Sequence, residues 1–386
     1  MKMMRTAIIG GGASGLVAAI NSTKHGEVVL FEKDERVGKK ILQTGNGRCN
    51  FCNMNLSPAF YNNPDFVGKV FAKIGRDDLL DFFAKIGLCY CSDEEGRMYP
   101  ASNQASSVLD TLRYECMRRG VEMQLSTDVK DIKIVDKKFE IEGKIFDKVI
   151  IATGNLPNSF IRELGHSSST PRQGLCSLRV AQNDVLGLMG IRTKASVKLE
   201  YNGEKFVESG EIQFKNQALG GICIFNIASI ISRKNIKNPT IFVDFAPKTS
   251  RIDLKNEINA RLVKLKSEPI ENVFVGMFQR LLSQFFLKRC DISPVIICSN
   301  IDEKKVDKLV EIIKNCPIRI LGTEGQGQVR VGGIKVDEID DNLMSKFVPN
   351  LYFVGECLDV DGLCGGYNLA WAWASALLAS KQKDTF

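Results

Sequence analysis

Three glycines and one glutamate near the start of the chain have the spacing of a phosphate-binding turn. Gly10, Gly12 and Gly15 form the pattern G-x-G-x-x-G, and Glu32 follows 17 residues after Gly15. In a strand–turn–helix unit, the first glycine permits a tight turn, the second lets a pyrophosphate approach the backbone, and the third lets the helix pack closely on the strand. An acidic side chain in the position of Glu32 accepts hydrogen bonds from a ribose 2′-hydroxyl and would repel the 2′-phosphate of NADP. These four residues therefore predict a dinucleotide site that disfavours NADP.

The neighbouring sequence supplies the elements that must position this turn. Residues 5–10 (RTAIIG) and 27–32 (EVVLFE) are short apolar runs that predict buried strands, and residues 13–25 predict the helix between them. The apolar segments VIIATG (149–154) and NLYFVGE (350–356) predict further strands of the same sheet. The fold class that follows is α/β, with a Rossmann-like nucleotide-binding domain.

The pattern changes along the middle of the chain, which predicts an insertion into that domain. Residues 65–86 and 105–119 predict helices, and a further helix is expected around VFVGMFQRLLSQFF (273–286). We expect the binding domain to be discontinuous, with an inserted β-rich substrate domain and a small helical domain. The expected boundaries are 1–175 and 331–386 for the binding domain, 176–250 and 317–330 for the β-rich domain, and 251–316 for the helical domain.

Composition limits the classes of partner. The chain has 386 residues, with 52 basic and 45 acidic side chains that are interleaved. No basic stripe with interleaved aromatic residues is visible, which disfavours nucleic acid as a partner. No run of about 18 apolar residues suggests a membrane span. The twelve cysteines are scattered and no signal-peptide pattern precedes them, so we expect reduced thiols in a cytoplasmic protein.

Several segments together resemble the YhiN/BaiN-type flavoproteins, which are also called aminoacetone-oxidase-like and belong to the two-dinucleotide-binding-domain class. The segments are GGGASGLVAAI, GKKILQTGNGRCNFCN, GRMYPASNQASSVLD, VGGI and GECLDVDGLCGGYNLAWAWAS. The resemblance covers nearly the whole chain and implies bound FAD, a three-part architecture and redox chemistry. One member of this family is assigned as a bile-acid 4,6-reductase.

The resemblance also implies which residues hold FAD. The ADP half would lie on the opening turn and on the acid after the second strand, with an adenine contact at the end of the strand-like segment MQLSTDV. The flavin half would lie along the GKK and TGNGRCN segments and on the glycine turn before the last helix, whose N–H groups would face the flavin pyrimidine edge. The residues implied are Gly10, Gly12, Ala13, Ser14, Gly15, Glu32, Lys39, Lys40, Gly45, Asn46, Gly47, Arg48, Cys49, Asn50, Val129, Thr153, Gly154, Gly355, Glu356, Asp361, Gly362, Gly366, Tyr367, Asn368 and Leu369.

The catalytic group stays open between two residues beside the inferred flavin edge. Tyr367 could donate a proton to a substrate, and Arg48 could stabilise developing negative charge. Cys49 and Cys52 form a C-x-x-C that relatives mostly lack, and it is either a redox-active dithiol or an inert pair. No second C-x-x-C accompanies it, which disfavours zinc. His166 follows a predicted helix end and is more typical of a polar residue at a helix C-terminus than of a catalytic acid.

The activity we expect is hydride transfer between N5 of FAD and a small organic substrate. The leading form is reduction of an activated C=C bond with NAD(P)H as electron donor, and no second nucleotide motif offers NAD(P)H a domain of its own. Oxidation of an amine or aminoketone by O2 is one alternative. A non-catalytic FAD-binding protein or a partner in RNA modification is the other. The sequence does not indicate an oligomeric state.

Overall fold

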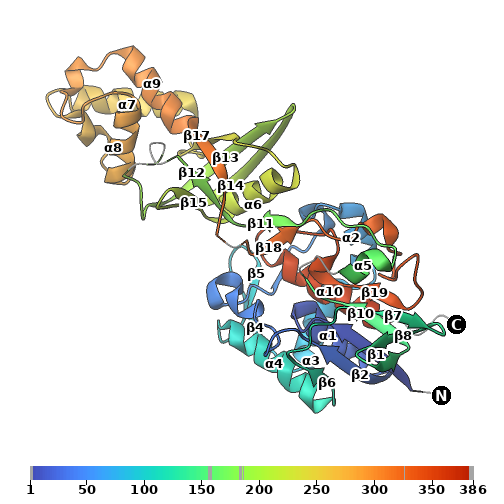
Figure 1. Ribbon diagram of the computed structural model, residues 1–386. Helices are drawn as coiled ribbons and strands as arrows, with labels where there is room; N and C mark the ends of the chain where they lie inside the picture. Colours follow the sequence, from blue (N-terminus) through green and yellow to red (C-terminus); the bar gives the residue numbers. More distant parts are fainter. Residues whose placement is uncertain (1–2, 155–158, 182–184, 186, 326, 382–386) are drawn as a thin grey trace. The chain divides into compact units, whose positions relative to one another are not determined.

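The chain folds into two compact units, and the first of them is discontinuous. The computed structural model describes residues 3–154, 159–181, 185, 187–325 and 327–381. One unit comprises Met1–Arg172 and Gln328–Phe386, and the other comprises Gln173–Gly327 (Figure 1). The blue and red ends of the chain therefore belong to the same unit. The functional roles predicted for the separate domains stay a prediction.

A parallel sheet of five strands forms the centre of unit 1. Its order is β19-β10-β1-β2-β6, and every neighbouring pair is parallel. Strand β1 pairs with β2 on one side and with β10 on the other, so the chain changes direction across the sheet at β1. Such a switch point leaves a crevice beyond the carboxyl ends of the strands, where ligands bind in open α/β sheets. The strands are β1 (Met4–Ile9), β2 (Gly26–Phe31), β6 (Glu122–Gln124), β10 (Lys148–Ile151) and β19 (Leu351–Phe353).

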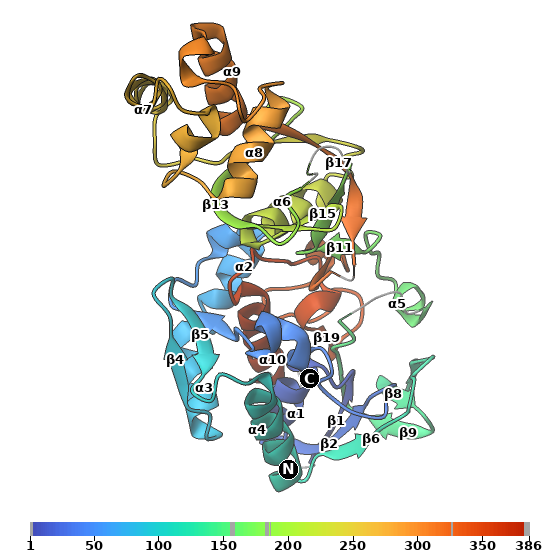
Figure 2. The ribbon, with the colours of Figure 1, turned by 90° about the vertical axis from the view of Figure 1, so that its left-hand side faces the viewer.

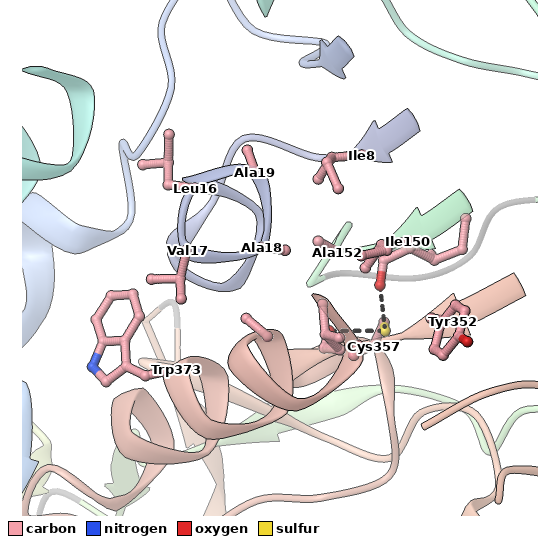
Figure 3. Close-up of a cluster of buried hydrophobic side chains, with 14 of the residues drawn as sticks. Ile8, Leu16, Val17, Ala18, Ala19, Ile150, Ala152, Tyr352, Cys357 and Trp373 are labelled. Carbon is pink, nitrogen blue, oxygen red and sulfur yellow. Dashed lines mark hydrogen bonds between the residues drawn. The ribbon is translucent and has the colours of Figure 1, made fainter. Parts of the chain in front are cut away.

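Two helices cover the same part of this sheet in layers. Helix α1 (Ala13–Ser22) is buried along almost its whole length, and α10 (Tyr367–Lys381) packs against it. Figure 3 shows Ala18 on the side of α1 toward Ile150 and Val17 on the side toward Trp373 of α10. Both helices are apolar on nearly all sides because each lies between other buried elements.

The remaining elements of unit 1 flank this core, and one prediction about them is wrong. The helix predicted over 65–86 is two helices, because the chain breaks before Gly75, which caps the second one. Helix α4 lies alongside α1 (Figure 2). The helices are α2 (Pro64–Phe71), α3 (Arg76–Lys85), α4 (Ala105–Arg118) and α5 (Ser159–Glu163). The 3-10 helices are η1 (Ile41–Gly47), η2 (Pro58–Phe60), η6 (Val336–Glu338) and η7 (Gly355–Cys357). The short strands are β3 (Cys52–Asn53), β4 (Tyr90–Ser92), β5 (Arg97–Pro100), β7 (Lys133–Val135), β8 (Lys138–Ile141) and β9 (Lys144–Phe146).

Unit 2 contains a closed antiparallel barrel with the order β12-β15-β14-β13-β16-β17. Its strands are β12 (Ser177–Val180), β13 (Arg192–Tyr201), β14 (Glu204–Lys215), β15 (Ala218–Gly220), β16 (Thr240–Asp244) and β17 (Cys316–Glu324). The helices are α6 (Ile222–Arg233), α7 (Arg251–Lys264), η4 (Ile270–Phe274), α8 (Arg280–Arg289), η5 (Cys298–Asn300) and α9 (Glu303–Lys314). Strands β11 (Arg172–Gly174) and β18 (Val329–Val331) lie near the two ends of this segment.

Two local predictions for this segment are corrected by the structure. Helix α6 interrupts the stretch 176–250, for which the sequence predicts a β-rich domain and indicates no helix. The helix expected over 273–286 begins only at Arg280, because η4 ends at Phe274 and Gly276 takes a positive φ of 79°. The barrel and the helices share one hydrophobic core, which contains Ile241 and Val243 of β16 together with Leu254 and Ile258 of α7. None of the described helices is long and apolar enough to cross a membrane.

Candidate cofactor-binding site

The turn after β1 uses its three glycines in different ways. A Cβ atom on Gly10 would lie 2.6 Å from the carbonyl oxygen of Ala152, and one on Gly15 would lie 1.8 Å from the carbonyl oxygen of Gly10. Gly10 also has a φ of +104°, which favours glycine. Apart from its two neighbours in the chain, no described residue has an atom within 4 Å of a Cβ placed on Gly12. Gly10 and Gly15 are therefore required by packing, whereas Gly12 faces open space.

The N-terminus of α1 faces the same open space. Gly12 is its N-cap, and within the described residues no side chain bonds to the cap and no acidic residue lies in the first turn. The first N–H groups of a helix have no intrahelical partner and carry a partial positive charge. Ala13 and Ser14 belong to this turn, and a Cβ on Gly355 would lie 2.6 Å from the Ser14 hydroxyl oxygen. The turn can therefore accept an anion next to Gly355.

The carboxylate of Glu32 is held in place beside this turn. Its Oε2 atom accepts a hydrogen bond from the N–H of Gly11 at 2.7 Å, and its Oε1 atom accepts one from the N–H of Asp34 at 2.9 Å. The Lys39 ammonium lies 3.4 Å from an Asp34 carboxylate oxygen. Glu32 is nearly buried, so its remaining acceptor positions are fixed in direction at the carboxyl end of β2.

Val129 lies in the loop that runs beside Glu32. The strand expected to reach Val129 is wrong in extent, because β6 ends at Gln124 and Ser126 takes a left-handed conformation with a φ of 52°. The N–H of Thr127 donates to the carbonyl oxygen of Glu32 at 2.8 Å. This bond keeps the loop, and the buried Val129, next to the end of β2.

The ends of β10 and β19 meet at the same edge of the sheet. The Glu356 carboxylate accepts a hydrogen bond from the N–H of Arg330 at 2.6 Å and from the Lys40 ammonium at 2.8 Å. A Cβ on Gly154 would lie 3.5 Å from this carboxylate. The hydroxyl oxygen of Thr153 is buried and has no hydrogen-bond partner among the described residues. This edge thus holds a polar group whose hydrogen bonding the protein itself does not complete.

The segment TGNGRCN makes an irregular turn that carries the chain to a second set of contacts. Gly45, Asn46 and Gly47 take φ values of 56°, 55° and 82° in succession. A Cβ on Gly45 would lie 2.7 Å from the backbone nitrogen of Asn50. Arg48 is exposed, whereas Cys49 is buried.

Asn50 joins this segment to the glycine turn before α10. When its amide is oriented to satisfy its hydrogen bonds, the oxygen accepts from the N–H of Gly366 at 3.1 Å, and the nitrogen donates to the carbonyl oxygens of Met98 and Cys52 at 3.2 and 3.0 Å. A Cβ on Gly366 would lie 2.3 Å from the Cys52 carbonyl oxygen. The structure therefore brings together the two motifs that the resemblance assigns to the flavin.

Some N–H groups of the turn before α10 donate hydrogen bonds to side chains of the protein itself. The N–H of Asp361 donates to the Asn62 side chain at 2.8 Å, and that of Gly362 donates to the Asn368 side chain at 2.9 Å. These two N–H groups, which the resemblance assigns to the flavin, thus already have protein acceptors. Helix α10 begins at Tyr367, and the first N–H groups of a helix lack intrahelical acceptors. The donors that remain for a ligand are those of Tyr367, Asn368 and Leu369.

The two candidate catalytic side chains, Tyr367 and Arg48, differ in exposure and in the contacts that hold them in place. Burial raises the pKa of the Tyr367 phenol, and the nearby Cys52 raises it further, so this phenol stays protonated at neutral pH. Its backbone carbonyl accepts a hydrogen bond from the hydroxyl of Tyr61 at 2.6 Å, which fixes the start of α10. The exposed Arg48 lies with its guanidinium carbon 4.6 Å from the ring centroid of Tyr99.

Tyr99 is a residue of this region that the sequence analysis does not single out. It lies on β5, two residues after Arg97. Burial raises the pKa of its phenol, and the charges of Arg97 and Arg48 partly oppose that rise. Its place in the motif GRMYPAS is a signal in the sequence, but the pairing with Arg48 depends on a contact between distant segments.

The thiols of the C-x-x-C are buried and poor nucleophiles. Burial raises the pKa of both Cys49 and Cys52 to about 11, so both are thiols at neutral pH. This protonation favours the inert pair over the redox-active dithiol. No group of three or more His, Cys, Asp or Glu side chains that could hold a metal ion is found in the described part of the chain.

His166 is also buried and serves a structural network. Its Nε2 atom lies 2.8 Å from the hydroxyl oxygen of Ser345, which already accepts hydrogen bonds from the N–H groups of Phe347 and Val348. Ser345 therefore donates its proton to Nε2, and the Nδ1–H of His166 donates to Glu338 at 3.2 Å. Burial lowers the pKa of His166, while Glu338 opposes this shift. The histidine thus links α5 to the segment around η6 in its neutral form.

Comparison with known proteins gives a family that matches almost the whole chain. The family described as HI0933-like protein Rossmann domain matches residues 4–382. A 3-dehydro-bile acid delta(4,6)-reductase of Clostridium scindens is 33% identical over 404 residues, which cover 98% of each chain. A ribosomal RNA dihydrouridine synthase of Haemophilus influenzae is 28% identical over 397 residues, which cover 96% of each chain.

A solved structure supports the same fold. The 3-ketosteroid delta1-dehydrogenase of Sterolibacterium denitrificans has a TM-score of 0.52 and 10% sequence identity, and the match covers 97% of this chain and 98% of the dehydrogenase. At this identity the similarity shows the arrangement of the chain and nothing further. It agrees with the predicted fold class, an α/β protein with a Rossmann-like sheet and a separate antiparallel part.

Proposed function

Because this chain belongs to the HI0933-like family, we propose that it is an FAD-dependent oxidoreductase. The single observation that carries the proposal is the open space at Gly12, which lies between the uncapped N-terminus of α1 and the fixed carboxylate of Glu32. Because Gly12 has no side chain, a pyrophosphate can approach the backbone N–H groups of the turn closely, and a ribose offers hydroxyl donors to a carboxylate.

The residues present fit both halves of FAD. The ADP half would take the turn from Gly10 to Gly15 with Glu32, and the unsatisfied hydroxyl of Thr153 offers a further hydrogen bond at the same edge. The flavin half would take the region where Asn50 meets Gly366, since the first N–H groups of α10 lie there. Bound FAD would supply the hydride-transfer chemistry.

The reaction proposed is reduction of a C=C bond conjugated to a carbonyl group. The names of both relatives fit this chemistry, because a dienone in a 3-dehydro-bile acid and the C5=C6 bond of uracil are each activated by a carbonyl. In such a reduction the β-carbon receives a hydride and the α-carbon receives a proton. NAD(P)H is the proposed electron donor, and O2-dependent oxidation of an amine is the alternative.

The protein's own task in this reaction is to bind, orient and neutralise charge. The Arg48 guanidinium would stabilise the negative charge that develops on the substrate carbonyl oxygen, since it is exposed and held against the Tyr99 ring. Tyr367 would supply the proton, because its phenol stays protonated at neutral pH. The positive end of α10 would favour electron-rich states of the bound group.

Turnover of defined substrates tests this function. Purified protein with FAD and NADPH or NADH is incubated without oxygen with a 3-oxo steroid that carries a Δ4 or Δ4,6 system, and the products are analysed by mass spectrometry. A gain of two mass units per reduced bond supports the proposal. If neither this ketone nor simpler enones are reduced with either donor, the proposed reaction is wrong.

A second candidate substrate is RNA, which the ribosomal RNA dihydrouridine synthase relatives favour. The same assay with an RNA transcript in place of the steroid, followed by nucleoside analysis, separates the two. Because the bile-acid reductase is 33% identical and the synthases are 28% and 26% identical, we expect dihydrouridine to be absent and the ketone to be reduced.

A further inference from the structure

A cavity lies at the amino-terminal edge of the parallel sheet, at the opposite ends of the strands from the proposed cofactor site. It has a volume of about 440 Å³ and is lined by residues before or at the start of β1 and β2, and by the first residues after α4. Among the lining residues are Met3, Lys24, His25, Glu27 and Arg119. This volume falls within the range of about 300–1,000 Å³ that small-molecule sites occupy.

The charged groups around this cavity are mainly cationic. Burial lowers the pKa of the Lys24 ammonium, and the positive charges of Arg119, Lys381 and Lys85 lower it further. The Lys24 ammonium donates a hydrogen bond to the Asn21 side-chain oxygen at 2.6 Å, which leaves two of its protons for other acceptors. Three cations from different elements thus repel the Lys24 ammonium, and one of them, Arg119, lines the cavity together with Lys24.

The carboxylates nearby are already engaged. Glu115 is almost fully buried and accepts from the guanidinium groups of both Arg118 and Arg119. Glu27, which lines the cavity, lies 3.5 Å from the Arg5 guanidinium. The local balance is therefore positive, which disfavours a cation or a neutral apolar molecule as occupant.

The partial charges at helix ends explain why each basic residue lies at a helix C-terminus, but they do not explain why these residues lie close to one another. Lys24, Lys85, Arg119 and Lys381 each follow or end a helix, where the partial negative charge of the C-terminus favours a cation. The interaction of a cation with a helix C-terminus falls off within the last turn of that helix, so it does not bring residues of different helices together around a cavity. The ends of α1 and α10 are instead tied together by a 2.9 Å hydrogen bond from the Asn21 amide to the Ser380 hydroxyl, which holds the cations close to one another.

We propose that this cavity is a second binding site, for a small phosphorylated molecule that carries at least two phosphate groups. The phosphates would lie between Lys24 and Arg119, and Met3 and Val28 would contact an apolar part of the ligand. The site is separate from the cofactor turn, because Lys24 precedes β2 whereas Glu32 follows it. The proposal does not depend on the proposed oxidoreductase activity.

Binding of pyrophosphate tests the proposal by titration calorimetry. The protein is loaded with FAD and then freed of unbound FAD by desalting, so that the turn around Gly12 is filled and no free FAD competes for the cavity. It is kept in a metal-free buffer of low salt at pH 7. We expect one site per chain, with weaker binding of inorganic phosphate. Lys24→Gln should weaken pyrophosphate binding by about tenfold, since a charge-assisted hydrogen bond and a positive charge are lost.

Two further variants make the result specific. Lys24→Arg keeps the charge and should keep the binding, and Lys237→Gln removes an exposed lysine of unit 2 and should leave it unchanged. If wild-type protein binds no pyrophosphate under these conditions, the proposal is overturned. It is equally overturned if Lys24→Gln binds pyrophosphate as tightly as the wild type does.

Discussion

Alanine substitutions at Gly12 and Gly15 should separate cofactor binding from folding, although the two glycines lie in one turn. Gly12 has φ −79° and ψ −164°, an extended conformation that alanine adopts readily. Apart from its two neighbours in the chain, no described residue has an atom within 4 Å of the added Cβ. We therefore expect the unfolding free energy of FAD-free Gly12→Ala to stay within about 1 kcal/mol of the wild type. The added methyl group fills the space that the pyrophosphate needs, so FAD affinity should fall at least tenfold, which corresponds to about 1.4 kcal/mol.

Gly15→Ala should lower both the stability of the FAD-free protein and its affinity for FAD. Its Cβ would lie 1.8 Å from the Gly10 carbonyl oxygen, so β1 and α1 must move apart. Overpacking of this kind costs about 3 kcal/mol, which exceeds the gain of about 1 kcal/mol from replacing glycine in a helix. FAD should then bind weakly because the turn itself is distorted.

Two measurements test the expected stabilities and FAD affinities of these variants. Urea unfolding of the FAD-free proteins, followed by far-ultraviolet circular dichroism, gives the stabilities, and quenching of flavin fluorescence on titration gives the affinities. If Gly12→Ala binds FAD as tightly as the wild type, the pyrophosphate does not approach this glycine and the assignment of the turn is refuted.

Three other features give predictions. Because burial raises the pKa of Cys49 and Cys52 to about 11, both should react with iodoacetamide at pH 8 at least tenfold more slowly than the exposed Cys89. Peptide mapping would measure these rates, and rapid labelling of either thiol would contradict its burial. Lys148 is buried, donates a 2.7 Å hydrogen bond to a carbonyl near the end of α10, and lies with its ammonium 4.1 Å from the Tyr352 ring centroid. Lys148→Ala should therefore lower the unfolding free energy, measured by urea titration, by about 2–3 kcal/mol. An unchanged midpoint of unfolding would show that these contacts contribute nothing to stability. Burial lowers the pKa of His166 from its ordinary value of 6.5, so the unfolded chain binds the proton more tightly than the folded protein does. The unfolding free energy should therefore fall as the pH drops below about 6.5. His166→Asn should lose less stability between about pH 7.5 and 5.5 than the wild type, and equal losses would place the pH dependence at another residue.

The parts of the structure that local patterns specify could be predicted from the sequence. The strand, turn and helix around Gly10 and Gly15 follow from glycine spacing and apolar runs, and the structure has them as β1, α1 and β2 with boundaries shifted by a few residues. The break between α2 and α3 was missed because a glycine within an apolar helical pattern does not reveal whether it interrupts the helix or caps a new one.

Contacts between distant segments could not be predicted from patterns of this kind. The hydrogen bond between Asn50 and Gly366 joins residues more than 300 positions apart, and only the family resemblance suggested that their motifs share a site. The stacking of Arg48 on Tyr99 had no periodic signal at all. The engagement of the Asp361 and Gly362 N–H groups by asparagine side chains likewise depends on the folded turn.

The most direct test of the central claim is the visible spectrum of the purified protein, recorded without oxygen while NADH and then NADPH are added. The account predicts a yellow protein whose absorbance near 450 nm, typical of bound flavin, is lost on addition of a nicotinamide donor and returns when the conjugated ketone is added. A protein that retains no flavin after incubation with FAD would contradict the account. A flavin that neither donor reduces would contradict the proposed reductase and favour an oxidase reduced by its own substrate.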